Sequence, residues 1–148
     1  HLGDPRRACR CTPDQVARYR GKLSGPFLDR IDLFIEVPAL SPEQLSRAAD
    51  GETSAQVRQR VAAAWERQLA RQGEANACLN GQALDRHCPM TPAARQLLEK
   101  AGQQLHLSAR AWHRILRLAR TIADLAGIDL LDTPHLAEAI QYRRLAHA

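Results

Sequence analysis

Two adjacent charged residues, Asp29 and Arg30, stand in the stretch 22–33 (KLSGPFLDRIDL), directly before an alternating apolar segment. A guanidinium in this position can make two kinds of interaction. It can pair with a neighbouring carboxylate as a surface salt bridge, which contributes at most about 1 kcal/mol. It can instead bind phosphate oxygens through two parallel N–H donors. The stretch alone leaves both interpretations open.

Arg110 is a second candidate for binding an anion. Residues 109–126 show helical periodicity, with an apolar stripe about 120° wide at 100° per residue, and Arg110 stands in the first turn. A cation there opposes the helix dipole and lies beside unpaired backbone N–H groups. Such a local conflict is typical of a functional position, here an anion site. Arg114, Arg117 and His113 project to the side opposite the stripe, which favours a solvated basic face.

The basic residues are nearly all arginine. Lys22 and Lys100 are the only lysines among 21 basic residues, the net charge is +5 and the pI is about 9.5. GC-rich coding and a phosphate-bearing partner both account for this bias, so nucleic acid or nucleotide is indicated without being required. The chain contains no G-x-x-x-x-G-K-[ST], G-x-G-x-x-G, H-E-x-x-H or G-x-S-x-G motif. It therefore lacks a recognisable catalytic core of its own.

Four cysteines are present, Cys9, Cys11, Cys78 and Cys88. Their spacing is unlike the disulfide framework of a small secreted protein, which favours free thiols in a reducing cytoplasm. No signal peptide and no apolar run of membrane length is present, so a cytoplasmic protein is expected.

Helix-start signals organise the rest of the chain. A Ser or Thr cap followed by proline occurs at Thr12, Ser41, Thr91 and Thr133, and further caps are expected at Thr53 and Ser108. These signals predict helices at 13–22, 42–49, 54–72, 92–104, 109–126 and 134–145. Residues 73–89 are expected to form a loop. Trp65 and Trp112 fall at apolar helical positions and are expected in the core.

One segment has strand periodicity. Residues 31–37 (IDLFIEV) alternate apolar and polar side chains and end at Pro38. A lone strand cannot pair with itself, so its sheet must lie outside this chain or be absent. The expected fold is mainly α: a leader at 1–38 with one helix and one orphan strand, then a helical domain at 39–148.

Several of these motifs resemble one known family. They are residues 9–15 (CRCTPDQ), 18–20 (RYR), 22–26 (KLSGP), 28–33 (LDRIDL) and 35–38 (IEVP), with 108–125 (SARAWHRILRLARTIADL) and 135–143 (HLAEAIQYR) in the tail. Together they resemble the magnesium-chelatase-like AAA+ ATPases of the ComM/YifB type, over most of the chain and least between Arg47 and Pro89. The resemblance implies the end of the ATPase core at 1–38 and a C-terminal helical lid domain at 39–148. Walker A and Walker B would lie upstream.

The resemblance also implies roles for individual residues. Arg30 would be the arginine finger that reaches the γ-phosphate of ATP in the neighbouring subunit, with Asp29 orienting it. Arg110 would be the sensor-2 arginine. Cys9 and Cys11 would be half of a possible zinc site, completed by two upstream cysteines. The intact protein would use ATP and Mg²⁺, form a hexameric ring and act as a helicase on branched or single-stranded DNA in natural transformation. No cofactor is expected in this part alone.

Two other functions stay open at this stage. The arginine-rich helical domain could be an autonomous nucleic-acid-binding module, although no helix-turn-helix signature is present. The parent protein could instead be a magnesium chelatase subunit acting on protoporphyrin. The C-x-C-T leader and the run R-Y-R-x-K-L-S-G-P favour the ComM/YifB type.

Overall fold

The structure is a computed structural model, and it describes residues 2, 7–28, 30–46 and 51–144. The chain divides into two compact units. The first unit comprises His1–Ile31 and Ile35–Gly51, and the second comprises Asp32–Phe34 and Glu52–Ala148. Each unit is described by itself.

Short capped helices make up the first unit. They are α1 (Pro13–Arg20), α2 (Gly25–Leu28) and α3 (Pro42–Ser46). Thr12 caps α1 in a complete capping box with Gln15, as predicted. Ser41 and Gln44 exchange the same pair of hydrogen bonds at α3. The helix predicted at 13–22 ends two residues earlier, at Arg20. Residues 47–49, the predicted end of α3, lie outside the described part of the chain.

The strand predicted at 31–37 is not formed. Within the described residues, this segment is extended but belongs to no β-ladder, and Leu33, Ile35 and Val37 are exposed. The sequence period is correct for a strand, but a strand also needs a partner for its backbone N–H and C=O groups. No other described segment supplies one. The fold class is mainly α, as predicted.

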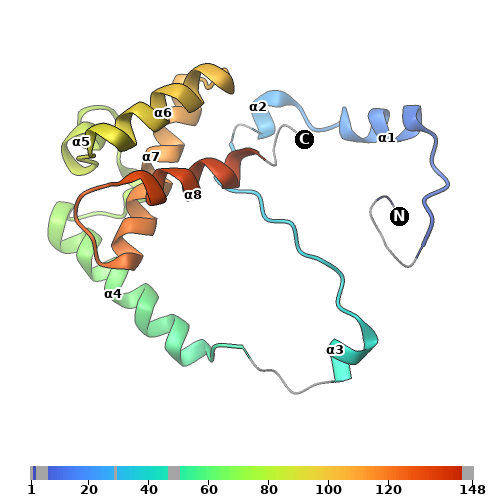
Figure 1. Cartoon of the computed structure of the whole chain (residues 1–148), viewed down its shortest axis with the longest axis horizontal. Coiled ribbons are helices and arrows are strands. Elements are labelled where there is room, and N and C mark those ends of the chain that lie inside the picture. Colours follow the sequence, from blue (N-terminus) through green and yellow to red (C-terminus); the bar gives the residue numbers. More distant parts are fainter. Residues whose placement is uncertain (1, 3–6, 29, 47–50, 145–148) are drawn as a thin grey trace. The chain divides into compact units, whose positions relative to one another are not determined.

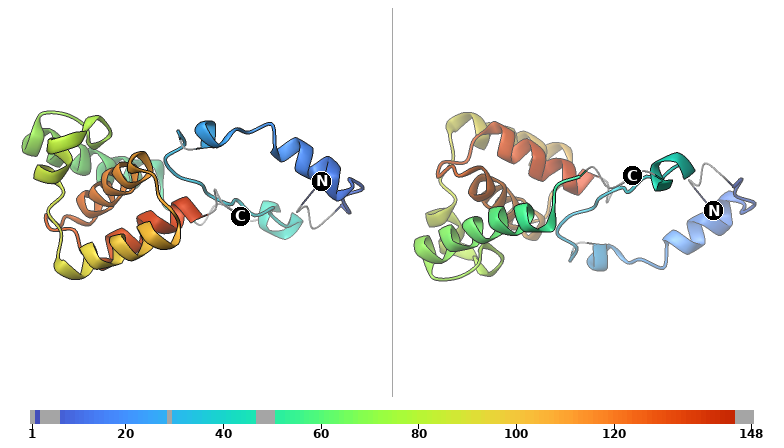
Figure 2. Two further views of the ribbon diagram at one scale, coloured as in Figure 1. Left: turned by 90° about the horizontal axis from the view of Figure 1, so that it is seen from above. Right: turned by 90° about the horizontal axis from the view of Figure 1, so that it is seen from below.

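The second unit is a helical domain (Figure 1). It contains α4 (Ser54–Gln72), the 3₁₀ turn η1 (Asn76–Cys78), α5 (Gly81–His87), α6 (Pro92–Gln104), α7 (Ala109–Ala126) and α8 (Thr133–Arg144). Helix α7 contacts α4, η1, α5 and α8, and α8 also contacts α6 (Figure 2). The bounds predicted for α4, α6 and α7 are confirmed. Within the described residues, no helix combines the length and apolarity needed to cross a bilayer.

Aliphatic side chains fill the core around α7. Its fully buried members come from α5 to α8 and from the connections between helices, and include Leu79, Leu84, Leu98, Ile115, Leu131 and Leu136. Small residues such as Ala94, Ala119 and Ala139 are completely buried and let the helices approach closely. This composition agrees with the aliphatic core that 4% aromatic content requires.

Two local predictions are corrected. Residues 73–89 contain η1 and α5 instead of an irregular loop, because Leu79, Leu84 and Cys88 are buried against the core and fix this short stretch. Thr133 is the first residue of α8 and not its cap. The Asp132 carboxylate accepts the Thr133 N–H at 2.8 Å and the Thr91 hydroxyl at 2.8 Å.

The turn between α6 and α7 fixes where α7 begins. The Leu107 N–H donates to the Gly102 carbonyl at 3.0 Å, and His106 has a φ of 48°. This is the six-residue closure of a Schellman motif, with a non-glycine residue at its left-handed position. His106→Gly should therefore raise the free energy of unfolding by about 0.5–1 kcal/mol.

Urea denaturation followed by circular dichroism measures this change. Gln103→Gly is the matched control, because Gln103 lies three residues before His106 and within α6. This substitution should lower stability by about 1 kcal/mol. Equal losses in the two variants would contradict the strain assigned to His106.

Candidate functional site

Helix α7 carries Arg110 at its N-terminal end. The Ser108 hydroxyl accepts the Ala111 N–H at 3.1 Å and so caps the helix as predicted. Arg110 is the second helical residue and is exposed. Among the described residues, none accepts a hydrogen bond from its guanidinium. The arginine therefore extends from the positive end of the helix into solvent, which is the geometry expected of an anion site.

Arg30 lies just past α2 in the first unit. The α2 turn is capped by Ser24, whose hydroxyl accepts the Phe27 N–H at 3.3 Å. The Arg30 N–H donates to the Phe27 carbonyl at 2.9 Å, and its guanidinium approaches the Pro26 carbonyl at 3.4 Å. The side chain is exposed. Asp29, predicted to orient it, lies outside the described residues. Arg30 and Arg110 belong to different units.

Cys9 and Cys11 lie close enough to share hydrogen bonds. The Cys11 backbone N–H, followed by its thiol, lowers the pKa of Cys9, and the same thiol contact raises the pKa of Cys11. Neither forms a disulfide. Within the described residues, no group of three His, Cys, Asp or Glu side chains is arranged to hold a metal ion. The half-site for zinc stays a prediction. Cys88 is buried, which raises its pKa to about 11 and keeps the thiol protonated at neutral pH.

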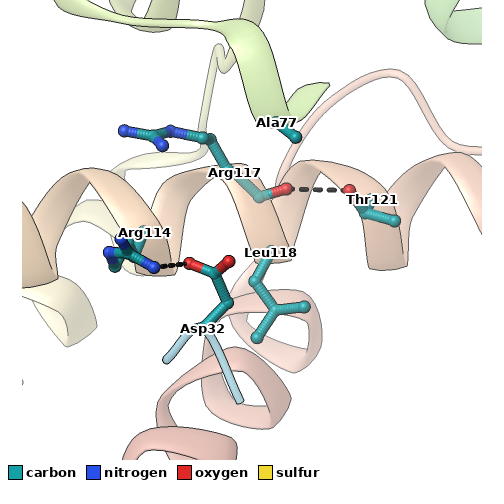
Figure 3. A pocket seen from close by; sticks show the side chains of 6 residues that line it. All are labelled: Asp32, Ala77, Arg114, Arg117, Leu118 and Thr121. Atoms are coloured by element: carbon teal, nitrogen blue, oxygen red, sulfur yellow. Dashed lines mark hydrogen bonds and ion pairs between the residues drawn. The ribbon is translucent and has the colours of Figure 1, made fainter. Parts of the chain in front are cut away.

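Arg114 departs from the solvated basic face predicted for it. Its side chain is only 16% exposed and forms an ion pair with Asp32, from the extended segment before Leu33 (Figure 3). The pair lines a cavity of about 170 Å³ together with Leu118 and Thr121. The Arg117 guanidinium points away from Asp32 (Figure 3). Asp32 and Arg114 are 82 residues apart, and no local pattern relates the two positions.

A buried polar network ties α4 and η1 to α7, and sequence reasoning missed it. The Arg71 guanidinium donates two hydrogen bonds to the Asp124 carboxylate, at 2.6 and 2.9 Å. Asn76 donates to the same carboxylate at 2.8 Å and accepts from Arg71 at 2.8 Å. Arg120 approaches Asp124 at 3.2 Å and donates to the carbonyls of Ile128 and Asp129. The network joins the C-terminal turns of α7 to α4, to η1 and to the residues that follow α7.

The charge state of Asp124 follows from this network. Burial alone would raise the pKa of its carboxyl, but the hydrogen bonds from Arg71 and Asn76 and the charge of Arg120 outweigh it and lower the pKa. Burial lowers the pKa of Arg120, against the attraction of Asp124. The i, i+4 spacing of Arg120 and Asp124 was the one sequence signal that could have indicated this network.

The buried surface of α7 is wider than its apolar stripe because other helices pack against it on several sides.

Trp65 is also placed differently from the prediction. It is 50% exposed, with Val61 and Leu69 exposed one turn before and after it on α4. Trp112 packs against the core, as predicted, and its ring lies over Gly102. The α4 face toward α7 is instead formed by Ala64, Gln68 and Arg71.

The helical domain and the leader each match a family model from the same class of protein. Residues 51–143 match the family model described as "Magnesium chelatase, subunit ChlI C-terminal", and residues 1–45 match "Magnesium chelatase, subunit ChlI". The chain belongs to this magnesium-chelatase-like family.

Individual relatives place it within the family. The chain is 50% identical over 137 residues to the competence protein ComM of Haemophilus influenzae, and 47% identical over 137 residues to the uncharacterized protein YifB of Escherichia coli. It is 40% identical over 140 residues to an uncharacterized protein of Mycobacterium tuberculosis. Each match covers 92% of this chain. The chain spans 27% of the length of the first two relatives and 28% of the third.

Proposed function

We propose that this chain is the C-terminal part of an oligomeric AAA+ ATPase that drives DNA branch migration during recombination of incoming DNA. One observation carries the proposal. Arg110 is exposed at the capped N-terminus of α7, with no hydrogen-bond acceptor among the described residues, in a chain 50% identical to a competence protein. A cation in that position is unfavourable for the helix alone and becomes favourable once a phosphate is bound.

The two arginines have separate tasks in the proposed reaction. Phosphoryl transfer spreads negative charge over the γ-phosphate oxygens, which a guanidinium can stabilise. Arg30 would supply that charge to ATP bound by the adjacent subunit, with Asp29 holding it in place. Arg110 would sense the γ-phosphate and link nucleotide state to the position of the helical domain. ATP with Mg²⁺ supplies the transferred phosphoryl group, and the ATP-binding motifs belong to the upstream part.

The proposed assembly is a cytoplasmic ring of identical subunits acting on branched or single-stranded DNA. Adjacent subunits are needed because Arg30 would act on the nucleotide bound by its neighbour. Cys9 and Cys11 would complete a zinc site with two upstream cysteines of the complete protein. The family model that matches residues 1–45 is described as a magnesium chelatase subunit, which favours a second candidate, a motor for magnesium insertion into protoporphyrin.

The decisive experiment measures ATP hydrolysis by the complete protein with no DNA, linear duplex and a four-way junction, beside a strand-exchange assay on the junction. We expect junction DNA to stimulate turnover several-fold and ATP to be required for branch movement. Arg110→Ala should bind ATP yet lose this stimulation.

The controls separate the alternatives. If no DNA substrate changes the rate of ATP turnover, and the protein inserts magnesium into protoporphyrin in an ATP-dependent manner, the protein is a chelatase and not a helicase. DNA binding by this chain alone, with affinity falling steeply as salt rises and no ATPase in the complete protein, would leave only a nucleic-acid-binding module.

A further inference from the structure

We propose that the helical domain carries a binding site for the phosphate groups of a nucleic-acid strand, in a cavity lined by α4 and α5. The cavity measures about 550 Å³, and its lining includes Arg67, Arg71, Arg86, His87 and Asp129. All five residues belong to the second unit. The inference goes beyond the proposed function, because it assigns to this domain a nucleic-acid contact that is distinct from the nucleotide contacts.

The cavity brings positive charges together. Arg67 and Arg71 lie four residues apart on α4, and Arg86 lines the same cavity from α5. Like charges at that helical spacing destabilise a helix, and a third guanidinium from another helix adds to the repulsion. Among the described lining residues, Asp129 supplies the one carboxylate. A bound anion would turn the remaining repulsion into attraction, which is the behaviour expected of an anion site.

Arg86 and His87 offer hydrogen-bond donors that the protein does not use. Arg86 is exposed and His87 is half-buried, and within the described part of the chain neither side chain has a hydrogen-bond or ion-pair partner. Both stand in the last turn of α5, where a cation is favourable. That position explains why they suit the helix, but not why they share a cavity with arginines of α4. Because a guanidinium has five donors and an imidazole at least one, this side of the cavity can bind several phosphate oxygens.

Arg67 is available to a ligand as well, whereas Arg71 is already occupied. Four of the five N–H donors of Arg71 are used within the protein, two of them on Asp124, so Arg71 mainly shapes the cavity wall. Arg67 lies 3.8 Å from the Asp129 carboxylate, beyond hydrogen-bond distance, and the two side chains are 46% and 95% exposed. Such an exposed pair is weak, so a phosphate can take the place of Asp129.

The chemistry of the lining favours a phosphodiester backbone as the ligand. A guanidinium binds two phosphate oxygens through parallel N–H donors. The cavity is larger than a single inorganic anion needs, and its size is that of pockets that enclose a ligand of many atoms. Among the described residues, no Phe, Tyr or Trp lines it, so it offers none of these rings for a base to stack on. We therefore expect contact with the backbone and little dependence on base sequence.

The cavity and Arg110 lie at opposite ends of α7. Arg110 is in the first turn of this helix, whereas Asp129 follows Gly127, the residue that caps its C-terminal end. About 25 Å of helix separates Arg110 from Gly127. Gly127 itself lies beside the Arg67 guanidinium. A phosphate of ATP at Arg110 and a nucleic-acid phosphate in the cavity would therefore occupy separate places.

The test measures binding of a short fluorescent single strand of DNA, and of its duplex, to this chain by anisotropy over a range of salt concentrations. Arg86→Gln should weaken binding several-fold at low salt. It should also lower the salt slope, the change of log affinity with log salt, by about 0.7 for the single strand or about 0.9 for the duplex, because one phosphate contact is lost. Arg67→Gln should behave in the same way. Binding of either form through Arg86 supports the site, and the tighter form identifies the strand state that it takes.

Asp129→Asn tests the same site with the opposite sign. It removes the carboxylate that competes for Arg67, so it should tighten binding several-fold. A variant that had lost its fold would not bind more tightly, so this gain separates a specific site from a general loss of structure. Unchanged or weaker binding would mean that Asp129 does not face the bound strand, and would overturn the site.

Arg95→Gln and Glu99→Gln are the matched controls. Both residues are exposed on α6 and outside the cavity lining, and their substitutions change the net charge by the same amounts as those of Arg86 and Asp129. They should have little effect on affinity or on the salt slope. If Arg95→Gln weakens binding as much as Arg86→Gln, net charge alone accounts for the affinity and the site is overturned.

The remaining outcomes distinguish this site from the proposed function. If neither the single strand nor the duplex binds at low salt, the site is overturned whatever the complete protein does with ATP. If a polyglutamate peptide binds through Arg86 and DNA does not, the cavity takes carboxylates and the site is likewise overturned. If DNA binds through Arg86 but no DNA changes ATP turnover by the complete protein, the proposed function falls and the site stands.

Discussion

Arg30→Ala in the complete protein should lower kcat for ATP hydrolysis by about 10³-fold or more and leave ATP affinity within a few-fold of wild type. An arginine that completes a phosphoryl-transfer site from a neighbouring subunit contributes about 10³–10⁵ in rate, because it meets charge that develops only in the transition state. Single-turnover hydrolysis and fluorescent-nucleotide binding measure the two quantities separately.

Arg30→Ala keeps the local backbone hydrogen bond. Arg30 follows the last turn of α2 and is exposed, and its backbone N–H bond to Phe27 does not depend on the side chain. Arg18→Ala is the matched control, since Arg18 is another exposed arginine of the same unit, on α1. It should retain full activity. Arg30→Lys should stay impaired because an ammonium cannot reproduce the planar fork.

Mixed rings test whether Arg30 acts on a neighbour's nucleotide. Subunits carrying Arg30→Ala are mixed with subunits that cannot hydrolyse ATP but keep Arg30. Turnover should appear in the mixture although each component alone is inactive. Mixtures that stay as inactive as their components, despite forming rings, would show that the arginine works within its own subunit or does not contact ATP.

The helix pattern was predictable because its signals are local. A capping residue and its first-turn partner lie within three positions of each other, so Thr53 and Gln56 could be recognised without a tertiary structure. The same holds at Ser108 and Thr91. The prediction that Thr133 caps α8 was wrong because the carboxylate of the adjacent Asp132 is a stronger hydrogen-bond acceptor than a hydroxyl. This carboxylate accepts from the Thr133 N–H and from the Thr91 hydroxyl.

The strand predicted at 31–37 is absent because strand formation depends on contacts that are not local. Alternation of apolar and polar residues shows which side chains would lie on each face of a strand, whereas a β-ladder needs a partner strand, which the local sequence does not specify. The same limitation hid the contact of Asp32 with Arg114. At the candidate site, residue types and local helix position identified Arg110 as unusual, but the roles proposed for Arg110 and Arg30 rest on resemblance alone.

Buried charges were the least predictable feature. Arg120 and Asp124 look like an ordinary i, i+4 surface pair when α7 is considered alone. They are buried because α4 and η1 cover that side of the helix and bring Arg71 and Asn76 to complete the hydrogen bonds. A cation and an anion can be core residues only when such partners are present, and those partners lie about 50 residues away in the sequence.

Asp124→Asn should lower the free energy of unfolding of this chain by about 3–5 kcal/mol, since it leaves Arg71 and Arg120 without their buried carboxylate. Asp124 is 3% exposed, so water cannot replace the lost interactions. Urea denaturation at pH 7 measures the change. Asp129→Asn is the matched control: its side chain is 95% exposed and lies 3.8 Å from Arg67, so the effect should stay within about 1 kcal/mol.

The loss should depend on pH in a defined direction. The network lowers the pKa of Asp124 in the folded state below the unfolded value of about 3.9. The unfolded carboxyl therefore binds a proton first as pH falls, and the stabilisation present above pH 4 is lost as pH falls toward the folded pKa. The stability difference between wild type and Asp124→Asn should be constant from pH 5 to 7 and shrink below pH 4. A difference that grew on acidification would mean that the carboxyl is already protonated in the folded protein, and that Arg71 and Arg120 are held by something other than its charge.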